Sequence, residues 1–438
     1  MAGISNIPKI PELRRRLLFT LAMLAVYRIG AHISVPGIDS GLLTEFLRQQ
    51  AGTIFGLFDT FTGGAFFKMS IFGLGIMPYI TASIIFQLLG VVIPYLEQLQ
   101  KEGEIGRKKI NQYTRYATVG LCALQAIGTG VWLSRLKVGN LPVVPEGGPL
   151  FLLTTVVTLT AGTIFIMWLG ELITERGIGN GISLIIFFGI VARIPNDLAD
   201  TLNLWQMGQL SFFLLIGLGV FMVAVIAGIV FMERAQRRIP VQYPSRTVGR
   251  KMYKGVKTHL PLRINTSGVI PPIFASSLLS FPLTFTQFFQ VKSKFFEWLN
   301  SALRMTSWEY NTIYGALIIF FAFFYTAVVF NPIDVADNLK RHGGYIPGVR
   351  PGQNTAEFID RILTRITVVG AIYLAVVCIL PSILINTAGV NFYFGGTSLL
   401  IVVGVAMDTA QQIEAHLLAR SYDGFLGPKG AKIRGRRR

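Results

Sequence analysis

The stretch TIFGLFDTFTGG, from Thr53 to Gly64, is apolar enough to enter a membrane but too short to cross one. As a helix, Thr53 to Thr62 would be about 15 Å long at ~1.5 Å per residue, whereas the hydrocarbon core of a bilayer is roughly 30 Å thick. Glycine alternates with large apolar side chains, and a carboxylate, Asp59, lies among phenylalanines. The role of such a segment depends on the predicted membrane spans around it.

The composition indicates a helical membrane protein that crosses the bilayer many times. Of the 438 residues, 52% are hydrophobic and 14% are charged, and the mean hydropathy is +0.55. Ordinary soluble domains contain about 25% charged residues. Runs of about 20 residues almost without charge recur along the chain, whereas a transmembrane β-barrel would show short alternating strands. We therefore expect an all-α polytopic membrane protein.

The basic residues indicate how the predicted spans are oriented. Of the 40 Lys and Arg residues, 31 fall at the even-numbered loops and the two termini, 8 fall at the odd-numbered loops, and Arg28 lies in the first span. By the positive-inside rule, this bias predicts an even number of spans with both termini cytoplasmic. The predicted spans are residues 17–34, 75–96, 112–134, 150–171, 180–195, 210–232, 265–284, 311–330, 364–386 and 397–418.

The N-terminus and the cysteines add two negative expectations. The first apolar run leads straight into the protein without a cleavage site, so no cleaved signal peptide is expected. Cys122 and Cys378 both lie in predicted spans, so no disulfide framework is expected.

The sixth and eighth loops carry more charge than orientation requires. The sixth, ERAQRRIPVQYPSRTVGRKMYKGVKTHLPLR, has nine basic residues and one acid, and the eighth has two Pro-Gly turns, PGVRPG, around Arg350. This favours a docking surface for an acidic or nucleic-acid-bearing partner. A purely topogenic role stays open as the alternative.

Signatures of enzymes and metal sites are missing from the sequence. It contains no GxxxxGK[ST], HExxH or GxSxG motif, and its four histidines are scattered singly. The glycine-rich run RGIGNGIS lacks the preceding strand and following lysine of a phosphate loop, so we interpret it as a tight turn before a short span. We expect no catalytic residue, no metal and no cofactor.

Two rival functions need features that the sequence supplies poorly. A solute carrier needs ionisable groups at mid-membrane, and the candidates are few: Arg28, Asp59 and Asp408. A membrane insertase or scaffold would lack a sealed pore, so an ion-tight pathway would distinguish it from a channel.

The second and seventh spans depart from the smooth apolar pattern. The second reads GLGIMPYITASIIFQLL, and the seventh reads INTSGVIPPIFASSLLSFP. Ten spans divide into two halves of five, and an odd number makes the second half enter from the opposite face, as in an inverted repeat. The irregular spans are then the second of each half, which points to a functional interface. Helix packing through small residues is the alternative.

Several strings along nearly the whole chain resemble the SecY family of bacterial protein-translocation channel subunits. They are GIMPYITASII, QYTRYATVG, MWLGELITERGIGNGIS, ERAQRRIP, GVIPPIFASS, FYTAVVFNP, ADNLK, GVRPGQNTAEFIDRI and FYFGGTSLLIVVGVAMDT. The resemblance implies ten helices in two inverted halves around a central pore, with a re-entrant plug helix. It also implies that unfolded polypeptide passes through the pore and that membrane helices leave sideways into lipid.

The resemblance assigns roles to four groups of residues. The plug covers about 53–67 and includes Thr53, Ile54, Phe55, Gly56, Leu57, Phe58, Asp59, Thr60, Phe61, Thr62, Gly63 and Gly64, with Asp59 expected in an aqueous outer funnel. The pore ring comprises Ile76, Ile80, Ile182, Ile186, Ile273 and Ile401. The lateral gate, between spans 2/3 and 7/8, has Thr81, Gln125 and Asn265, which are expected to hydrogen-bond to one another. Partner docking falls to Arg250, Lys251 and Arg350, where Lys251 replaces the family's second arginine and puts bidentate contact there in doubt.

The same resemblance implies partners, location and domain limits. The expected partners are the small SecE and SecG subunits, the SecA motor ATPase, the ribosome, signal peptides and nascent chains, and membrane lipids. The expected location is the bacterial plasma (inner) membrane. We expect a five-span half at 1–196, the sixth span and basic loop at 197–263, the remaining spans at 264–418 with a cytoplasmic loop at 331–363, and a basic tail at 419–438.

Overall fold

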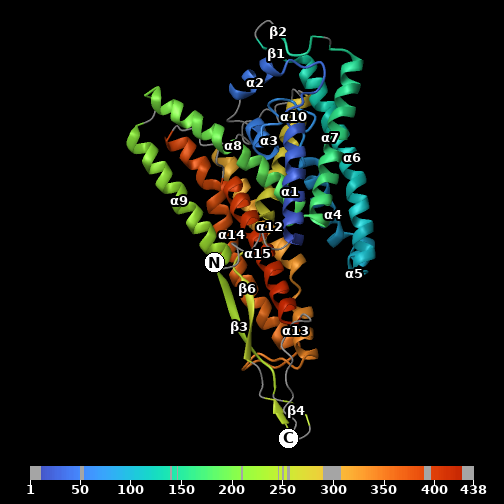
Figure 1. The fold of residues 1–438 in the computed structure, drawn as a ribbon, viewed down its shortest axis with the longest axis vertical. Helices are drawn as coiled ribbons and strands as arrows, with labels where there is room; N and C mark the ends of the chain where they lie inside the picture. The colour runs from blue at the N-terminus through green and yellow to red at the C-terminus, as the bar shows by residue number, and fades with distance from the viewer. Residues whose placement is uncertain are drawn as a thin grey trace.

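A computed structural model describes most of the chain, and each of the ten predicted spans coincides mainly with one helix, although the second also takes in the first residues of α5 (Pro94–Lys101) (Figure 1). The residues described are 11–49, 54–138, 141–145, 147–208, 211–244, 246–248, 251–253, 257–289, 307–388 and 396–426. The ten helices are α1 (Pro11–Gly30), α4 (Met77–Val92), α6 (Glu104–Arg135), α7 (Pro149–Arg176), α8 (Gly181–Gln206), α9 (Phe212–Arg234), α10 (Ile270–Phe289), α12 (Trp308–Val329), α14 (Gln353–Ala388) and α15 (Gly396–Leu426).

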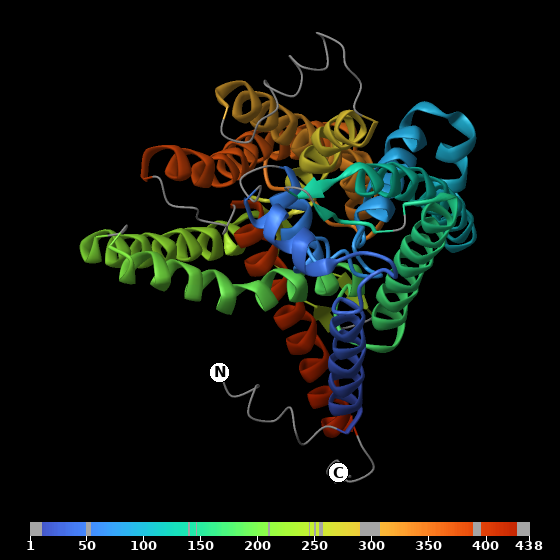
Figure 2. The same ribbon diagram turned by 90° about the horizontal axis from the view of Figure 1, so that it is seen from above.

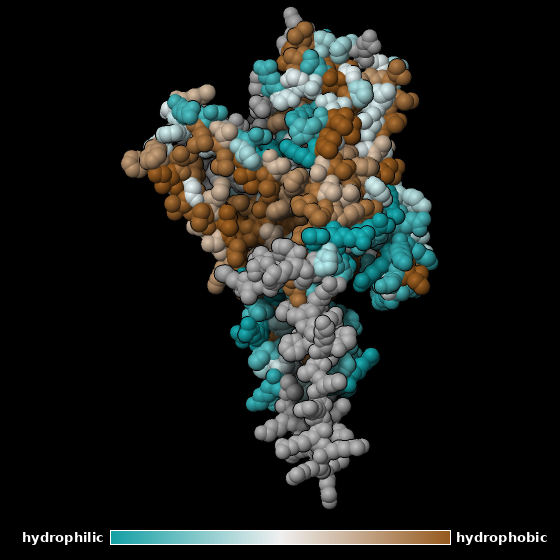
Figure 3. All heavy atoms as spheres, in the orientation of Figure 1, coloured by the Kyte–Doolittle hydropathy of each residue, from teal (hydrophilic) through white to brown (hydrophobic). Residues whose placement is uncertain are grey.

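Fewer than ten of these helices, as the structure describes them, are long and apolar enough, taken one by one, to be recognised as membrane spans. Among the described residues, six segments are long and apolar enough to cross a membrane, and they lie on α6, α7, α8, α9, α12 and α14. A seventh is added if α4 and α5 (Pro94–Lys101), which are bent by 100° at Pro94, count as one span. Figure 3 shows hydrophobic side chains over the middle of the helical body, with hydrophilic ones below them and in patches at the upper end. The protein is therefore a multi-pass membrane protein whose helices match the ten predicted spans in position.

One predicted span is longer than expected. The run RGIGNGIS does form a turn, in which Gly179 has a φ of +86° and Asn180 accepts hydrogen bonds from the amides of Ile182 and Ser183. The helix that follows, α8, extends to Gln206 in spite of Pro195. The prediction of a short fifth span was therefore wrong, because a proline inside a helix need not end it when the surrounding packing continues.

The first five and last five of these helices meet along two seams. At one seam, α10 packs against α4 and α6, and at the other, α15 packs against α8. Viewed from above, the segment of α2 (Ser40–Gln49) and α3 (Ile54–Thr62) lies near the middle of the helices (Figure 2). The half-length stretch, as α3, therefore lies within the bundle.

The two long basic loops pack together at the end of the molecule opposite β1 (Lys137–Val138) and β2 (Leu141–Pro142) (Figure 1). The sixth loop contains two antiparallel ribbons, β3 (Gln236–Gln242) with β6 (Lys257–Arg263) and β4 (Arg246–Val248) with β5 (Lys251–Tyr253). The eighth contains α13 (Pro332–Arg341).

Backbone and apolar contacts join these loops into one unit. Gln242 and Tyr345 exchange two backbone hydrogen bonds of 2.9 Å each. A separate hydrophobic cluster seals the contact with Ile239, Val241, Leu262, Ile346 and Ile359. The sequence analysis did not predict these strands, because Pro240, Pro244 and Pro261 obscure the alternating pattern.

The buried isoleucine at the base of this unit gives a test of its packing. Ile359 is fully buried, so Ile359→Ala should destabilise the joined loops by about 2–5 kcal/mol through lost burial and a cavity. Limited trypsin digestion of membranes should then cut the basic loop much faster than in the parent protein. Ile333→Ala is the matched control, because Ile333 is 63% exposed on α13. Equal cleavage rates in both variants would contradict the joined unit.

Candidate functional site

The half-length stretch forms a short helix that ends in two glycines. α3 covers nine residues, and Gly63 and Gly64 follow it with φ of +65° and +87°. The amide of Gly64 donates to the carbonyl of Asp59 at 3.0 Å, and this hydrogen bond closes the C-terminal end of α3. Glycine is required here because other residues rarely adopt such angles. Of the predicted plug residues, Thr53 and the side chains of Ile54, Phe55 and Leu57 lie outside the described part of the chain.

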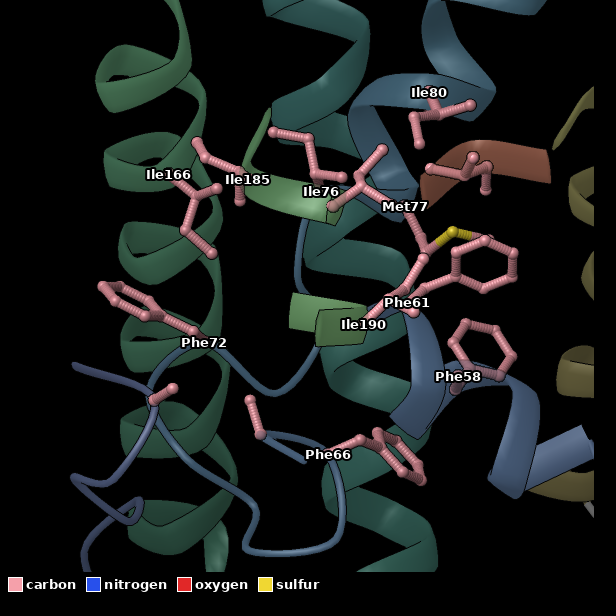
Figure 4. Close-up of a cluster of buried hydrophobic side chains, with 14 of the residues drawn as sticks. Phe58, Phe61, Phe66, Phe72, Ile76, Met77, Ile80, Ile166, Ile185 and Ile190 are labelled. Atoms are coloured by element: carbon pink, nitrogen blue, oxygen red, sulfur yellow. The ribbon is translucent and has the colours of Figure 1, made fainter. Parts of the chain in front are cut away.

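The end of α3 lies directly against the backbone of α8. A Cβ on Gly63 would come within 2.6 Å of the Cα of Gly189, so only glycine permits this approach. Phe58 and Phe61 of α3 belong to the same buried cluster as Ile190 of α8, as Figure 4 shows. Packing against α8 therefore holds α3 in place, although α3 does not cross the bilayer.

Two side chains of α1 satisfy the carbonyls at the C-terminal end of α3. The Tyr27 hydroxyl donates to the Thr62 carbonyl at 3.0 Å, and Arg28 Nη1 donates to the Gly63 carbonyl at 2.8 Å. Carbonyls at a helix end have no partner within the helix, and leaving them unpaired away from water is costly. Arg28, which lies inside a predicted span, thus has a defined partner, and its positive charge also suits a helix C-terminus.

Asp59 lies in a different environment from the one expected. It is 2% exposed, its Oδ1 accepts from the Phe67 amide at 2.9 Å, and its Oδ2 accepts from Arg193 Nη1 at 2.6 Å. The expectation that an aqueous funnel hydrates this carboxylate is wrong for this structure. A buried charge needs a partner, and the partner is an arginine of α8 that the sequence analysis did not single out. A charge of opposite sign in the fifth predicted span was the available signal.

The six isoleucines predicted as a pore ring gather in one hydrophobic cluster. Ile76, Ile80, Ile186 and Ile401 are buried in it, and Ile182 and Ile273 pack against it partly exposed. They come from α4 and the residue before it, α8, α10 and α15. Phe58 and Phe61 of α3 belong to the same cluster, and Figure 4 shows Ile76, Ile80 and Met77 near them. The structure thus places the six isoleucines and α3 in one continuous apolar core, and Ile76 and Ile80 lie near α3.

The three residues predicted for the gate lie on separate elements, and their hydrogen bonds go elsewhere. The Thr81 hydroxyl donates to the Met77 carbonyl within α4. Gln125 of α6 is buried, and its Oε1 has no hydrogen-bond partner in the described structure. Asn265, just before α10, donates to Glu233 Oε1 at 2.6 Å and to the Gly268 carbonyl at 3.1 Å. The expectation that these three bond to one another is not met among the described residues.

A second buried polar atom that lacks a partner among the described residues lies on α10, which packs against α6. Ser277 Oγ of α10 is buried without a hydrogen-bond partner in the described structure, as is Gln125 Oε1 of α6. An unsatisfied buried polar group costs about 1–3 kcal/mol.

Of the three predicted docking residues, the structure describes the side chain of Arg350 alone. Arg250 and the side chain of Lys251 lie outside the described part. Arg350 is exposed between two turns, at which Gly348 and Gly352 have φ of +83° and +111°. Its carbonyl accepts from the Thr355 hydroxyl at 2.9 Å, which ties the turn to the start of α14. The loop therefore presents one arginine to solvent from a fixed backbone.

Comparison of the sequence with known proteins finds a family model and several close relatives. The family model described as SecY matches residues 70–410. The chain is 49% identical over 431 residues to the protein translocase subunit SecY of Vibrio cholerae, covering 97% of this chain and 96% of the relative. It is also 49% identical over 427 residues to the subunit of the same name from Escherichia coli K12, with the same coverage.

Solved structures share the fold at much lower identity. One belongs to a study titled "The plug domain of the SecY protein stablizes the closed state of the translocation channel and maintains a membrane seal", with a TM-score of 0.66 and 18% identity over 98% of this chain and 99% of that one. Another is titled "Sec61 in the Canine ribosome-channel complex from the endoplasmic reticulum", with a TM-score of 0.59, 18% identity and the same coverage.

The two glycines after α3 allow a matched test of its docking. Gly63→Ala should displace α3 from α8, because the new Cβ would overlap the backbone of Gly189, whereas Gly64→Ala has open space around the new Cβ. Both positions have positive φ, so the strain of leaving glycine is similar. Hydrogen exchange measured by mass spectrometry should be at least about tenfold faster across α3 in Gly63→Ala than in Gly64→Ala. Equal rates would contradict the close contact.

Proposed function

The chain belongs to the SecY family, and on that premise we propose that it is the central protein-conducting subunit of a translocase. The family is one of channels, so the protein is not an enzyme. It passes unfolded secretory polypeptides across the membrane and releases transmembrane segments sideways into lipid. A motor or a translating ribosome supplies the energy from outside, because the sequence contains no nucleotide-binding loop of the P-loop type.

The observation that carries this proposal is the position of α3. A nine-residue helix cannot cross a bilayer, and non-helical backbone at membrane depth persists only when protein buries it or water surrounds it. Here its residues pack into the same cluster as the six isoleucines. A short helix docked against a ring of apolar side chains fits a plug that closes a pore and can leave it without unfolding a span.

The isoleucines suit a constriction that must seal and also yield. Apolar side chains around a narrow opening favour its dewetting, which blocks ions and water. They offer a passing chain no fixed hydrogen-bond partner, so one ring can accept many sequences. Ile182 and Ile186 come from α8, and Ile401 comes from α15, which packs against α8. We propose that these residues, with Ile76, Ile80 and Ile273, line the narrowest part of the pore.

The seam of α10 with α4 and α6 is our proposed lateral gate. Both sides of the proposed gate touch there, as expected of the closed state. The unpaired Gln125 and Ser277 make closure less stable than an apolar seam would. Asn265 acts in this proposal through its bond to Glu233, which fixes the start of α10 against α9. The apolar face of a signal sequence would replace α10 along the seam.

The joined basic loops are our proposed docking surface, with Arg350 as an exposed contact and Arg250 and Lys251 as further ones. Their positive charge suits a phosphate-rich or acidic partner. The canine structure of shared fold was determined as a ribosome-channel complex, which supports a ribosome as one partner here. We propose the SecA motor ATPase as the second, and SecE and SecG as small membrane subunits beside the helices.

The charge bias supports an orientation in the bacterial inner membrane with both termini cytoplasmic. The basic loop unit then faces the cytoplasm, and α3 lies toward the outer side. The proposed domain limits stay a prediction, with the first half at 1–196 and the second formed by 197–263 and 264–418, ahead of the basic tail at 419–438; the limit at 196 falls inside α8, which runs to Gln206.

Deleting the half-length stretch tests the channel directly. In planar bilayers, the intact protein should be silent, and the variant lacking Thr53 to Gly64 should show frequent ion-conducting openings, because the pore has lost the helix that fills it. If both remained silent even with a signal peptide and the motor ATPase present, the channel and plug proposals would fail together.

Replacing the unpaired glutamine tests the gate. Gln125→Leu removes a buried acceptor without a partner and should stabilise the closed seam by about 1–2 kcal/mol. Translocation of a precursor with a weakly hydrophobic signal sequence into vesicles should then slow several-fold. Gln112→Leu is the control, because Gln112 is exposed on the same helix. Unchanged or faster translocation in Gln125→Leu would argue against this seam as the gate.

A further inference from the structure

We propose that Arg193 is a positioning residue that keeps α3 in the pore through its ion pair with Asp59, and that displacement of α8 during opening breaks this pair. We call Asp59 and Arg193 together the plug latch. The inference rests on the proposed channel function. It assigns the closed position of the plug to one pair of side chains in this chain.

The geometry of the plug latch is that of a strong, shielded ion pair. Arg193 Nη1 lies 2.6 Å from Asp59 Oδ2, and the two side chains are 14% and 2% exposed. The other carboxylate oxygen accepts from the Phe67 amide, and the Arg193 guanidinium carbon lies 5.9 Å from the centre of the Phe67 ring. The carboxylate is thus bonded on both oxygens, and the guanidinium has a carboxylate and an aromatic face as neighbours.

The latch forms one of two contacts between α3 and α8 that share a spacing of four residues. Asp59 meets Arg193, and Gly63 meets Gly189, so the two helices run in opposite directions with matched turns. Residues four apart lie on one face of a helix. The glycine contact sets how close the helices come, and the charged contact sets where α3 lies along α8.

The C-terminal end of α3, which contacts Gly189 of α8, is also held by α1. Tyr27 and Arg28 of α1 bind the carbonyls of Thr62 and Gly63, beside the two glycines with positive φ. This end can act as a pivot, because its bonds are to backbone carbonyls and do not depend on the latch. Asp59 lies one turn inward from that pivot, so loss of the latch frees the body of α3 to swing while its end stays attached.

The cost of separating a buried ion pair explains why the latch can hold. Removing one partner leaves the other charge buried and unpaired, which is strongly unfavourable. During opening, however, water enters the funnel and hydrates both groups, so the same pair separates at much lower cost. The pair therefore opposes departure of α3 in the dry closed state and lets it leave once the pore is wet.

The position of Arg193 on α8 couples the latch to the ring. The same helix carries Ile182 and Ile186 of the isoleucine cluster and, two turns further on, Arg193. A polypeptide that pushes these isoleucines outward must move α8, which draws Arg193 away from Asp59. Widening of the ring and release of α3 thus become one event.

Single-channel recording of latch variants, without precursor, tests the proposal. Arg193→Gln and Asp59→Asn should each raise the open probability at least about tenfold over the intact protein, because each leaves one buried charge or dipole without its partner. The reversed pair, Asp59→Arg with Arg193→Asp, should fall back toward the intact value. Lys68→Gln, beside Phe67, removes a positive charge of the same segment outside the latch and should stay silent.

The variant lacking Thr53 to Gly64 is recorded alongside as the reference for an unplugged pore. If it conducts while Arg193→Gln and Asp59→Asn stay silent, the channel proposal stands and the latch is overturned. If the single variants conduct but the reversed pair conducts as much as their combined effect, loss of packing and not loss of pairing is the cause, and the latch is again overturned. If the deletion variant is itself silent, the proposed function fails as well.

Discussion

A helix too short to cross a bilayer must have the backbone groups at its ends and its charges satisfied by protein or by water in a cavity, and much of this structure follows from that constraint. α3 meets it with a carbonyl cap from Tyr27 and Arg28, a glycine turn at its end, and a paired carboxylate at Asp59. The side-chain partners Tyr27, Arg28 and Arg193 come from α1 and α8, far along the chain from α3. The docked position of the short helix therefore depends on the assembled bundle, and a change in the bundle can release it.

α8 is the element on which several of these functions converge. It receives the end of α3 at Gly189, pairs with Asp59 through Arg193, contributes two isoleucines to the apolar cluster, and packs against α15. The turn before it is also tied to α15, because the Gly179 amide donates to Gln412 Oε1 at 3.0 Å. One helix therefore contacts the other half of the bundle, carries two isoleucines of the proposed ring and holds α3, the proposed plug, so its displacement would affect all three.

The two seams between the halves differ in how well their polar groups are satisfied. At the α8–α15 seam, Gln412 accepts a backbone hydrogen bond across the contact. At the other, Gln125 Oε1 on α6 and Ser277 Oγ on α10 are buried without partners in the described structure. A helix contact that contains unpaired polar groups is less stable, so separating it costs less free energy. If both atoms face the contact with the other half, as in the proposed gate, this contact separates more easily than the contact of α8 with α15.

The sequence by itself determined the class of protein, the positions of ten helices and the half-length segment, because hydrophobic run length and charge bias are local properties of the chain. It also pointed to the isoleucines, through motif resemblance. Only the tertiary structure decided how Asp59 is satisfied, because Arg193 lies 134 positions away and carries no local signal of its partner. The same holds for the joined basic loops, where Gln242 pairs with Tyr345 across 103 positions, and for Asn265, whose amide donates to Glu233 of another helix.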